Sequence, residues 1–378
     1  MRPPLVLLFL LGSSAALAPA SLSVASAQND SSLDNYRMGI TFVITSMEAK
    51  IENQSGISNQ LINHLAPQDN EKHLTSLLLT RVIPSLETFV IALSVPLNVM
   101  AILIFVIKIH PKKPALVYML NLASADLFFA ITLPFKVAYH FSGHNWVFGP
   151  GLCRFVTTTF FGNMYCSILL MMAISIDRFL GVAYPMQSLS WRTVRRANMV
   201  CLAIWIAAIA GMIPLLMTEQ TKRIPHLNIT TCLDMLDVTV TMKHLRYYFS
   251  ALSVIFFFIP FIISTTCYVG IIRTLSSPNV AAKPGNRRRA ILLSAAVLCT
   301  FILCFGPNNV IMLVLSCNHR LEWLYLVYMV THSTGVMNSC IDPLIYYYAS
   351  SKYKRQILNL LHCKKHSDPE ICRSAYKP

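Results

Sequence analysis

The chain has 378 residues, of which 55 % are hydrophobic and only 12 % are charged, and its formal net charge is +15. A chain this long and this apolar is hard to keep soluble, and its long uncharged runs indicate a membrane protein. Its positive charge follows the membrane topology derived below, so the basic pI does not call for a nucleic-acid partner.

Residues 1–27 predict a secretory signal peptide. An apolar run over Leu5–Leu11 is too short to cross a bilayer, and small residues ending in Ala25–Ala27 follow it. Ala16–Ala18 is an alternative cleavage site. The mature chain is therefore expected to begin near Gln28, with its N-terminus outside the cell.

Residues 28–76 are expected to form an extracellular segment. The only basic residues in this segment are Arg37, Lys50 and Lys72. Two N-glycosylation sequons begin here, at Asn29 and Asn53, and a third begins at Asn228 in a later outer loop.

Seven apolar stretches of spanning length follow and predict an all-α membrane protein with a seven-helix receptor domain at 77–348. They cover 77–107, 114–139, 154–184, 198–217, 247–275, 290–315 and 324–348. The predicted cytoplasmic segments carry 17 Lys and Arg with two acids, whereas the outer segments carry eight with ten acids. Positive charge therefore lies inside, which indicates a multi-pass plasma-membrane protein with its N-terminus outside and its C-terminus in the cytoplasm.

Cysteines and prolines mark particular positions in these spans. Among the eleven Cys, only Cys153, Cys232 and Cys317 are expected to face the oxidising exterior. A Cys153–Cys232 disulfide would hold the loop between spans four and five over the outer end of the bundle, leaving Cys317 as a free thiol. Prolines interrupt six spans, where they permit either hinges or static bends: Pro96, Pro134, Pro214, Pro260, Pro307 and Pro343.

Four acidic residues lie within the spans: Glu87, Asp126, Asp177 and Asp342. Each costs about 3 kcal/mol at a helix centre, so each needs a partner or a water-filled site. Asp177 precedes Arg178 at the cytoplasmic end of span three, where the two neighbouring charges are expected to pair or to be separated by a partner protein.

The ordered set of L-x-x-x-D in span two, D-R-F in span three, F-x-x-C-F-x-P in span six and D-P-x-x-Y in span seven resembles the rhodopsin-like G-protein-coupled receptors. The resemblance implies a set of residues that rearrange on activation to open a cleft for a G protein: Asp177, Arg178, Phe305, Pro307, Asp342, Pro343 and Tyr346. Phe305 stands where the family more often has Trp.

Asp126 and Asp342 also resemble the carboxylates of the family's sodium pocket. Ser167 lies three helical turns before Arg178 on the same face, and amide side chains could complete a site for a hard cation. The expected sodium ligands are Asn98, Asp126, Asn163, Ser167, Asn338 and Asp342. The alternative is that these groups bridge one another through water. No other cofactor is expected.

Residues 349–378 are expected to form a short amphipathic helix on the inner leaflet, followed by a short tail. Tyr353, Ile357, Leu360 and Leu361 share an apolar face beside basic residues. Cys363 is then placed for palmitoylation, with membrane lipid as the partner. A tail without this helix is the alternative.

At closer range the chain resembles the protease-activated receptors, in segments that include KKPALVYMLNLASADL, SIDRFLGVAYPMQSLSWRT and CIDPLIYYYASS. The resemblance implies cleavage by a thrombin-like extracellular serine protease after Arg37 and before Met38. The new N-terminus would then act as a tethered agonist consisting of Met38, Gly39, Ile40, Thr41 and Phe42. This chain departs from the family pattern at Asn35-Tyr36, which replace a single Pro, and at Gly39, which replaces an aromatic residue.

The outer pocket also departs from the family pattern. The resemblance implies a ligand pocket that includes Phe161, Leu233, Asp234, Leu236, Tyr325 and Tyr328. Phe161 replaces a Tyr, Leu233 replaces a His, and Leu315-Ser316 replace His-Tyr. The pocket is therefore expected to be more apolar, which suits an apolar agonist or indicates that the tethered mechanism has been lost. The alternative for the two tyrosines is packing at the membrane interface.

The sequence thus predicts a receptor that couples extracellular proteolysis to G proteins of the Gq, G12/13 and Gi classes and to calcium release, with arrestin as a further partner. Span seven has no Lys for a retinal Schiff base, span three has no acid for an amine ligand, and no catalytic motif indicates an enzyme. One alternative is a receptor of the same fold for a soluble peptide or lipid, with Arg37 incidental. The other is a non-signalling surface protein that presents a protease.

Overall fold

The computed structural model describes residues 77–109, 113–225, 227–233, 240–276, 284–317 and 323–365. Residues 1–76, which include a separate unit at Met1–Ala66, lie outside this description. For some helical residues, among them 240–246, 284–290, Tyr325, Tyr346 and 360–365, only the backbone is described.

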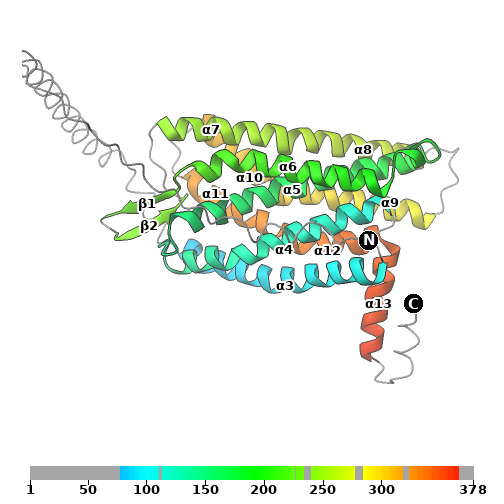
Figure 1. Cartoon of the computed structure of the whole chain (residues 1–378), viewed down its shortest axis with the longest axis horizontal. Helices are drawn as coiled ribbons and strands as arrows, with labels where there is room; N and C mark the ends of the chain where they lie inside the picture. Colours follow the sequence, from blue (N-terminus) through cyan, green and yellow to red (C-terminus); the bar gives the residue numbers. More distant parts are fainter. Residues whose placement is uncertain are drawn as a thin grey trace, which may run out of the picture. The chain divides into compact units, whose positions relative to one another are not determined.

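The described residues form a bundle of long antiparallel helices (Figure 1). The first four spans comprise η2 (Leu78–Val82) with α3 (Ile83–Leu103) and η3 (Ile104–Ile109), then α4 (Pro114–Phe141), α5 (Pro150–Ala183) and α6 (Val194–Met217). The next two comprise α7 (Val240–Ser253), η5 (Val254–Phe258) and α8 (Ile259–Ser276), followed by α9 (Pro284–Thr300), η6 (Phe301–Phe305) and α10 (Gly306–Cys317). The last comprises α11 (Trp323–Val336) and α12 (Asn338–Ala349).

The seven predicted spans agree with these helices. Six of the described helices are long and apolar enough to cross a membrane. The seventh span is divided at Met337 into α11 and α12, each of which is shorter than a bilayer requires alone. The apolar length of each stretch therefore predicted the fold, because a helix satisfies all of its backbone hydrogen bonds within the lipid.

Proline has a specific effect on three of the spans, which contain four wide π-helical segments: η2, η3, η5 and η6. Each π segment contains the residue four positions before a proline, as in η5 before Pro260 and η6 before Pro307. A proline ring clashes with the carbonyl group four residues earlier, and the wider turn makes room for it. Pro96, Pro134, Pro214 and Pro343 lie instead within α-helices.

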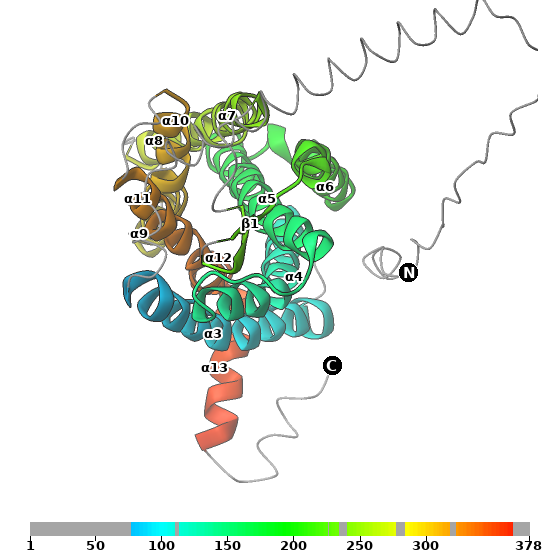
Figure 2. The same ribbon diagram turned by 90° about the vertical axis from the view of Figure 1, so that its left-hand side faces the viewer.

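The helices surround a continuous apolar core. Viewed along the bundle axis, α3, α4, α5 and α6 form one side of the ring, and the later spans close it (Figure 2). α5 contacts α4, α6 and α8, while α12 contacts α3, α4 and α9. The close approach of α8 to α5 requires Gly270, where a Cβ atom would come within 2.5 Å of the Phe179 ring.

A short helix, α13 (Ser351–Lys365), follows the last span and runs across the bundle axis (Figure 1). It is attached through Tyr353, which is fully buried and stacks on Phe105 of η3 with ring centroids 5.1 Å apart. Burial raises the pKa of Tyr353 to about 12. The predicted helix is thus present, and Tyr353 is the residue of its apolar face that anchors it to the bundle.

Replacing Tyr353 should therefore separate the roles of its ring and its hydroxyl. Tyr353→Ala removes a buried aromatic ring, so we expect a loss of about 3–5 kcal/mol of stability, measured as a lower Tm of the detergent-purified protein. Tyr353→Phe keeps the stacked ring and should lose less than half as much. Equal losses in the two variants would show that the hydroxyl, and not the ring, holds α13.

Candidate functional site

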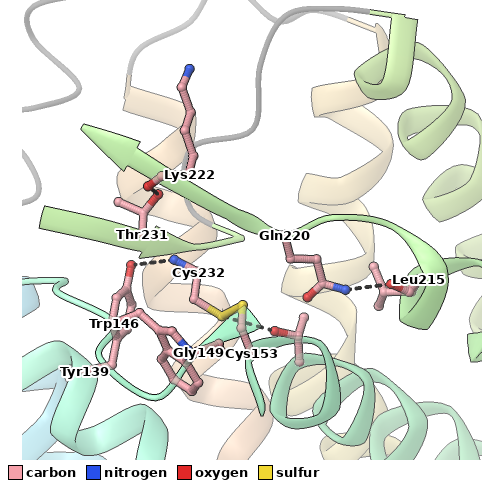
Figure 3. Close-up of a disulfide and its surroundings, with 10 residues drawn as sticks. Tyr139, Trp146, Gly149, Cys153, Leu215, Gln220, Lys222, Thr231 and Cys232 are labelled. Atoms are coloured by element: carbon pink, nitrogen blue, oxygen red, sulfur yellow. Dashed lines mark hydrogen bonds between the residues drawn. A yellow bond between two sulfur atoms is a disulfide. The ribbon is translucent and has the colours of Figure 1, made fainter. Parts of the chain in front are cut away.

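The outer end of the bundle carries a β-hairpin, β1 (Thr221–Ile224) and β2 (Ile229–Cys232), in the loop after α6. The expected disulfide is present: Cys232 at the end of β2 is bonded to Cys153 in the first turn of α5, and both are fully buried. Figure 3 shows β2 lying between β1 and the connection that joins α4 to α5. The hairpin is thus held across the outer end of the bundle, as Figure 2 shows.

Hydrogen bonds from the α4–α5 connection reinforce the disulfide. The backbone N–H of Trp146 donates to the carbonyl of Thr230 at 2.7 Å, and the N–H of Thr230 donates to Asn145 Oδ1 at 3.1 Å. The N–H of Cys232 donates to the hydroxyl of Tyr139 at 3.2 Å (Figure 3). These bonds occupy the edge of β2 that faces away from β1.

Beneath the hairpin lies a buried polar cluster. Glu87 of α3 and His140 of α4 are 1 % and 2 % exposed, and His140 Nδ1 lies 3.1 Å from Glu87 Oε2. Ser333 of α11 donates to the other carboxylate oxygen at 3.5 Å. The cluster also contains Lys136, whose ammonium lies over the Tyr139 ring, and His144 beside His140.

The cluster shows how Glu87, the acid in span one, is accommodated. The sequence indicated that Glu87 needs a partner, but its partner is 53 residues away on another helix. His140 is the penultimate residue of α4, and nothing in its local sequence marks it. His144, which packs beside it, lies beyond the end of α4 in a turn with a φ of +62°, so helical spacing could not have paired the two.

The predicted ligand-pocket residues are partly described. Phe161 is fully buried against Phe249, with ring centroids 4.9 Å apart. Tyr328 packs edge-on against His332. The His332 ring stacks on that of Phe160, with ring centroids 3.7 Å apart. Leu233 is half-buried with a φ of +68° just after the disulfide. The side chain of Tyr325, and all of Asp234 and Leu236, lie outside the description.

Midway through the bundle, four of the six predicted sodium ligands form two hydrogen-bonded pairs. Asp126 and Asp342 are fully buried and close enough to interact electrostatically. Asn163 donates to Asp126 at 3.5 Å, and Asn338 donates to Asp342 at 3.3 Å.

The same region is rich in oxygen atoms that accept no hydrogen bond. Among the described residues, one oxygen of each of the six side chains is buried without a partner: Asn98 Oδ1, Asp126 Oδ2, Asn163 Oδ1, Ser167 Oγ, Asn338 Oδ1 and Asp342 Oδ1. Two carboxylates surrounded by amide and hydroxyl oxygens form the donor set that hard cations prefer. The residues therefore fit a sodium ion, and they also fit bridging water.

Asn98 also ties the first span to the last. Its amide donates to the backbone carbonyl of Ser339 in α12 at 2.9 Å, and Ser94 donates to the same carbonyl at 3.3 Å. This carbonyl lies two residues after the break at Met337. The break thus allows a backbone oxygen to bond a neighbouring span.

The inner end differs from the sequence-based expectation. Asp177 does not take its ion-pair partner from its neighbour Arg178, because Arg192 donates to both carboxylate oxygens at 2.9 Å from the loop after α5. The planar guanidinium matches the carboxylate in a two-bond geometry that adjacent residues on one helix cannot form. This pair raises the pKa of Arg192 above its ordinary value.

The short helix η4 (Gln187–Ser190) lies in the same loop. The amide N–H of Arg192 donates to the carbonyl of Ser188, and Thr193 caps α6 by accepting from Arg196 N–H at 3.3 Å. The guanidinium also fills the space beside Gly181, where an added Cβ atom would meet it at 2.4 Å. Arg192 therefore fastens the loop to α5.

The other predicted switch residues have definite places. Phe305 is buried at the end of η6, with its ring at right angles to that of Phe301, two residues before Pro307. Pro343 lies within α12, directly after Asp342. The side chain of Tyr346 is outside the description.

Several predicted modification and cleavage residues cannot be placed. Asn228 is exposed in the hairpin turn, with a φ of +51°, which suits a glycan acceptor. The remaining sites lie outside the described residues or side chains: Asn29, Arg37, Met38, Gly39, Ile40, Thr41, Phe42, Asn53 and Cys363.

Comparison with known proteins identifies a family. The profile of the 7 transmembrane receptor (rhodopsin family) matches residues 97–346. Proteinase-activated receptor 1 of Homo sapiens is 51 % identical over 352 residues, covering 92 % of this chain and 80 % of that protein. The same receptor of Bos taurus is 54 % identical over 307 residues, covering 80 % and 72 %. The human S-geranylgeranyl-glutathione receptor P2RY8 is 36 % identical over 287 residues, covering 75 % and 80 %.

The buried Glu87–His140 pair generates a test by a double-mutant cycle. His140→Gln leaves a buried carboxylate without its partner, so we expect a loss of about 3–5 kcal/mol of stability. Adding Glu87→Gln should recover part of that loss, because it removes the unpaired charge. The measurement is the Tm of purified protein, with Ser85→Ala on the exposed face of α3 as the control. Strictly additive losses would show that the two side chains do not stabilise each other.

Proposed function

The chain belongs to the rhodopsin family of seven-transmembrane receptors and, within it, to the proteinase-activated receptors, and on this premise we propose that cleavage after Arg37 activates it. The new N-terminus beginning at Met38 is the agonist, and it remains tethered to the receptor. Tethering replaces affinity by a high effective concentration, so even a weakly binding short peptide occupies its site.

One observation carries the proposal. The match to human proteinase-activated receptor 1 covers 92 % of the chain and so leaves about 30 of its 378 residues outside. Even if all of these residues preceded the match, it would begin before Arg37. The match therefore includes Arg37 and the segment up to the first span. The similarity thus extends beyond the membrane domain into the segment that a protease reaches.

The architecture supports a route from the outer to the inner end. The agonist binds beneath and beside the hairpin, near Phe161 and Tyr328. The π segments before Pro260 and Pro307 are points where the fifth and sixth spans can change their bend. At the inner end, release of Asp177 from Arg192 would free the loop after α5 for a partner protein.

The family consists of receptors and not of enzymes, and the partners proposed here follow from it. They are a thrombin-like serine protease outside the cell and, inside, heterotrimeric G proteins of the Gq, G12/13 and Gi classes together with arrestin. Calcium release through Gq is the output on which the test below relies.

A second candidate function is supported by the more distant relative. P2RY8 is named as a receptor for S-geranylgeranyl-glutathione, a diffusible lipid-modified peptide. A receptor of this fold can therefore take a soluble ligand of mixed apolar and peptide character. If Arg37 is incidental, we propose a ligand of that class for this chain.

We further propose that sodium occupies the mid-bundle site. Six buried oxygen atoms without hydrogen-bond partners support this proposal. Asp126 and Asp342 would supply the charge, and the amide and hydroxyl oxygens would supply the remaining ligands. Bound sodium would hold α4, α5 and α12 together at their centres.

Proteolytic activation is tested in cells that express the chain with an epitope after Gln28. Thrombin should shed the epitope and release calcium from the native receptor, and both effects should be lost in Arg37→Gln. Lys50→Gln is the matched control, because it removes another extracellular basic residue and should retain both effects. Shedding without a signal, or shedding that persists in Arg37→Gln, would favour a soluble ligand.

Sodium binding is tested by the Tm of the purified receptor in increasing NaCl, with KCl at equal ionic strength as the reference. A ligand that binds only the folded state at 100 times its Kd stabilises it by about 2.7 kcal/mol. We therefore expect a rise in Tm with Na⁺ but not with K⁺, and its loss in Asp126→Asn. Equal responses to the two cations would leave water as the bridging species.

A further inference from the structure

The hairpin has one occupied edge and one open edge. The outward N–H groups of Thr230 and Cys232 on β2 are bonded to Asn145 and Tyr139, and the Thr230 carbonyl is bonded to Trp146. β1 lies on the opposite side of β2 from these residues (Figure 3). Its outer edge therefore faces away from the α4–α5 connection.

The register shows which backbone groups that open edge presents. Leu233 N–H donates to the Gln220 carbonyl at 2.8 Å, so this pair bonds across the hairpin. Bonding and non-bonding pairs alternate in an antiparallel ladder, so the pairs of Thr221 with Cys232 and of Arg223 with Thr230 do not bond across it. The N–H and carbonyl groups of Thr221 and Arg223 consequently point outward from β1.

These four groups are available to another strand. Within the described part of the chain, the backbone groups of Thr221 and Arg223 have no hydrogen-bond partner. Thr221 is half-buried and Arg223 is exposed. Two outward residues on one edge offer an extended peptide four hydrogen bonds, which is a common mode of peptide recognition.

The segment that follows the candidate cleavage site has the composition of a strand. Residues 40–45 read Ile-Thr-Phe-Val-Ile-Thr, and each of them is β-branched or aromatic. From Met38 to Phe42, apolar residues alternate with Gly39 and Thr41, as in a strand with one apolar face.

The tether is long enough to reach the hairpin. The 35 residues from Val43 to Leu77 join this segment to the first span, which begins at the outer end. A flexible chain of that length has an r.m.s. end-to-end distance of about 30–35 Å. The reach of the segment therefore does not limit its access to the hairpin.

We propose that the new N-terminal segment adds to β1 as a third, antiparallel strand, an inference that rests on the proposed function above. Gly39 and Thr41 form the hydrogen bonds with Thr221 and Arg223. Met38, Ile40 and Phe42 then lie on the face of the hairpin that carries Ile224, which is 5 % exposed. Backbone recognition accounts for an agonist whose second residue, Gly39, has no side chain.

The peptide side of the contact is tested with the amide of Met-Gly-Ile-Thr-Phe-Val on the uncleavable Arg37→Gln receptor. Each backbone nitrogen is methylated in turn, and calcium release is measured. Methylation at Gly39 or Thr41 should raise the EC50 at least tenfold, whereas methylation at Ile40 or Phe42 should change it less than threefold. If methylation at Ile40 or Phe42 raises the EC50 more than methylation at Gly39 or Thr41, the peptide pairs with β1 through its other edge, and the pairing of Gly39 and Thr41 is wrong.

The receptor side is tested with proline on the open edge. Arg223→Pro removes only an outward N–H that β2 does not use, which an edge strand tolerates, so the hairpin should persist. It should raise the EC50 of the peptide at least tenfold, while Arg223→Ala, which keeps the N–H, should stay within threefold. Surface expression and Tm identify any variant that fails to fold, in which case the methylation series on the parent receptor decides.

The outcomes separate this inference from the proposed function. If the parent peptide releases calcium but all methylated forms are equally active or equally inactive, strand addition is wrong and tethered agonism stands. Equal EC50 values for well-folded Arg223→Pro and Arg223→Ala lead to the same conclusion. If neither the peptide nor proteolysis releases calcium, the tethered agonist itself fails, and strand addition fails with it.

Discussion

The structure depends on one constraint, which is that a polar group within the bilayer must find its partner inside the protein. Each intramembrane acid satisfies it differently. Glu87 pairs with a histidine, Asp126 and Asp342 share a set of oxygens, and Asp177 is bonded by an arginine from outside its own helix. These partnerships connect a span with another span or with a loop, so the groups that are costly to bury also help to determine how the helices associate.

The extent of the spans was predictable from sequence because apolar length alone determines it. The Cys153–Cys232 disulfide was predictable by elimination, since few cysteines can face the exterior. Pairings between distant polar groups were not predictable in this way. Arg192 reaches Asp177 only because the loop after α5 turns back on itself, and no local pattern around either residue specifies that path.

The same contrast applies to the proline positions. Their sequence indicated bends, yet only the structure distinguishes Pro260 and Pro307, which follow π segments, from the four prolines within regular helices. The difference depends on whether neighbouring helices can accommodate a wider turn, as they do where Phe257 and Phe301 pack together between the fifth and sixth spans. Tertiary packing therefore decides which prolines create adjustable points.

The break at Met337 has a consequence for the speed of shape change. Any rotation of α12 against α11 must first detach the Ser339 carbonyl from both Asn98 and Ser94, in a region where water cannot readily replace those bonds. The activation enthalpy of such a motion is therefore high, while the two end states can be close in free energy. Two side chains of the first span that hold one carbonyl of the last therefore act as a brake on movement between these spans.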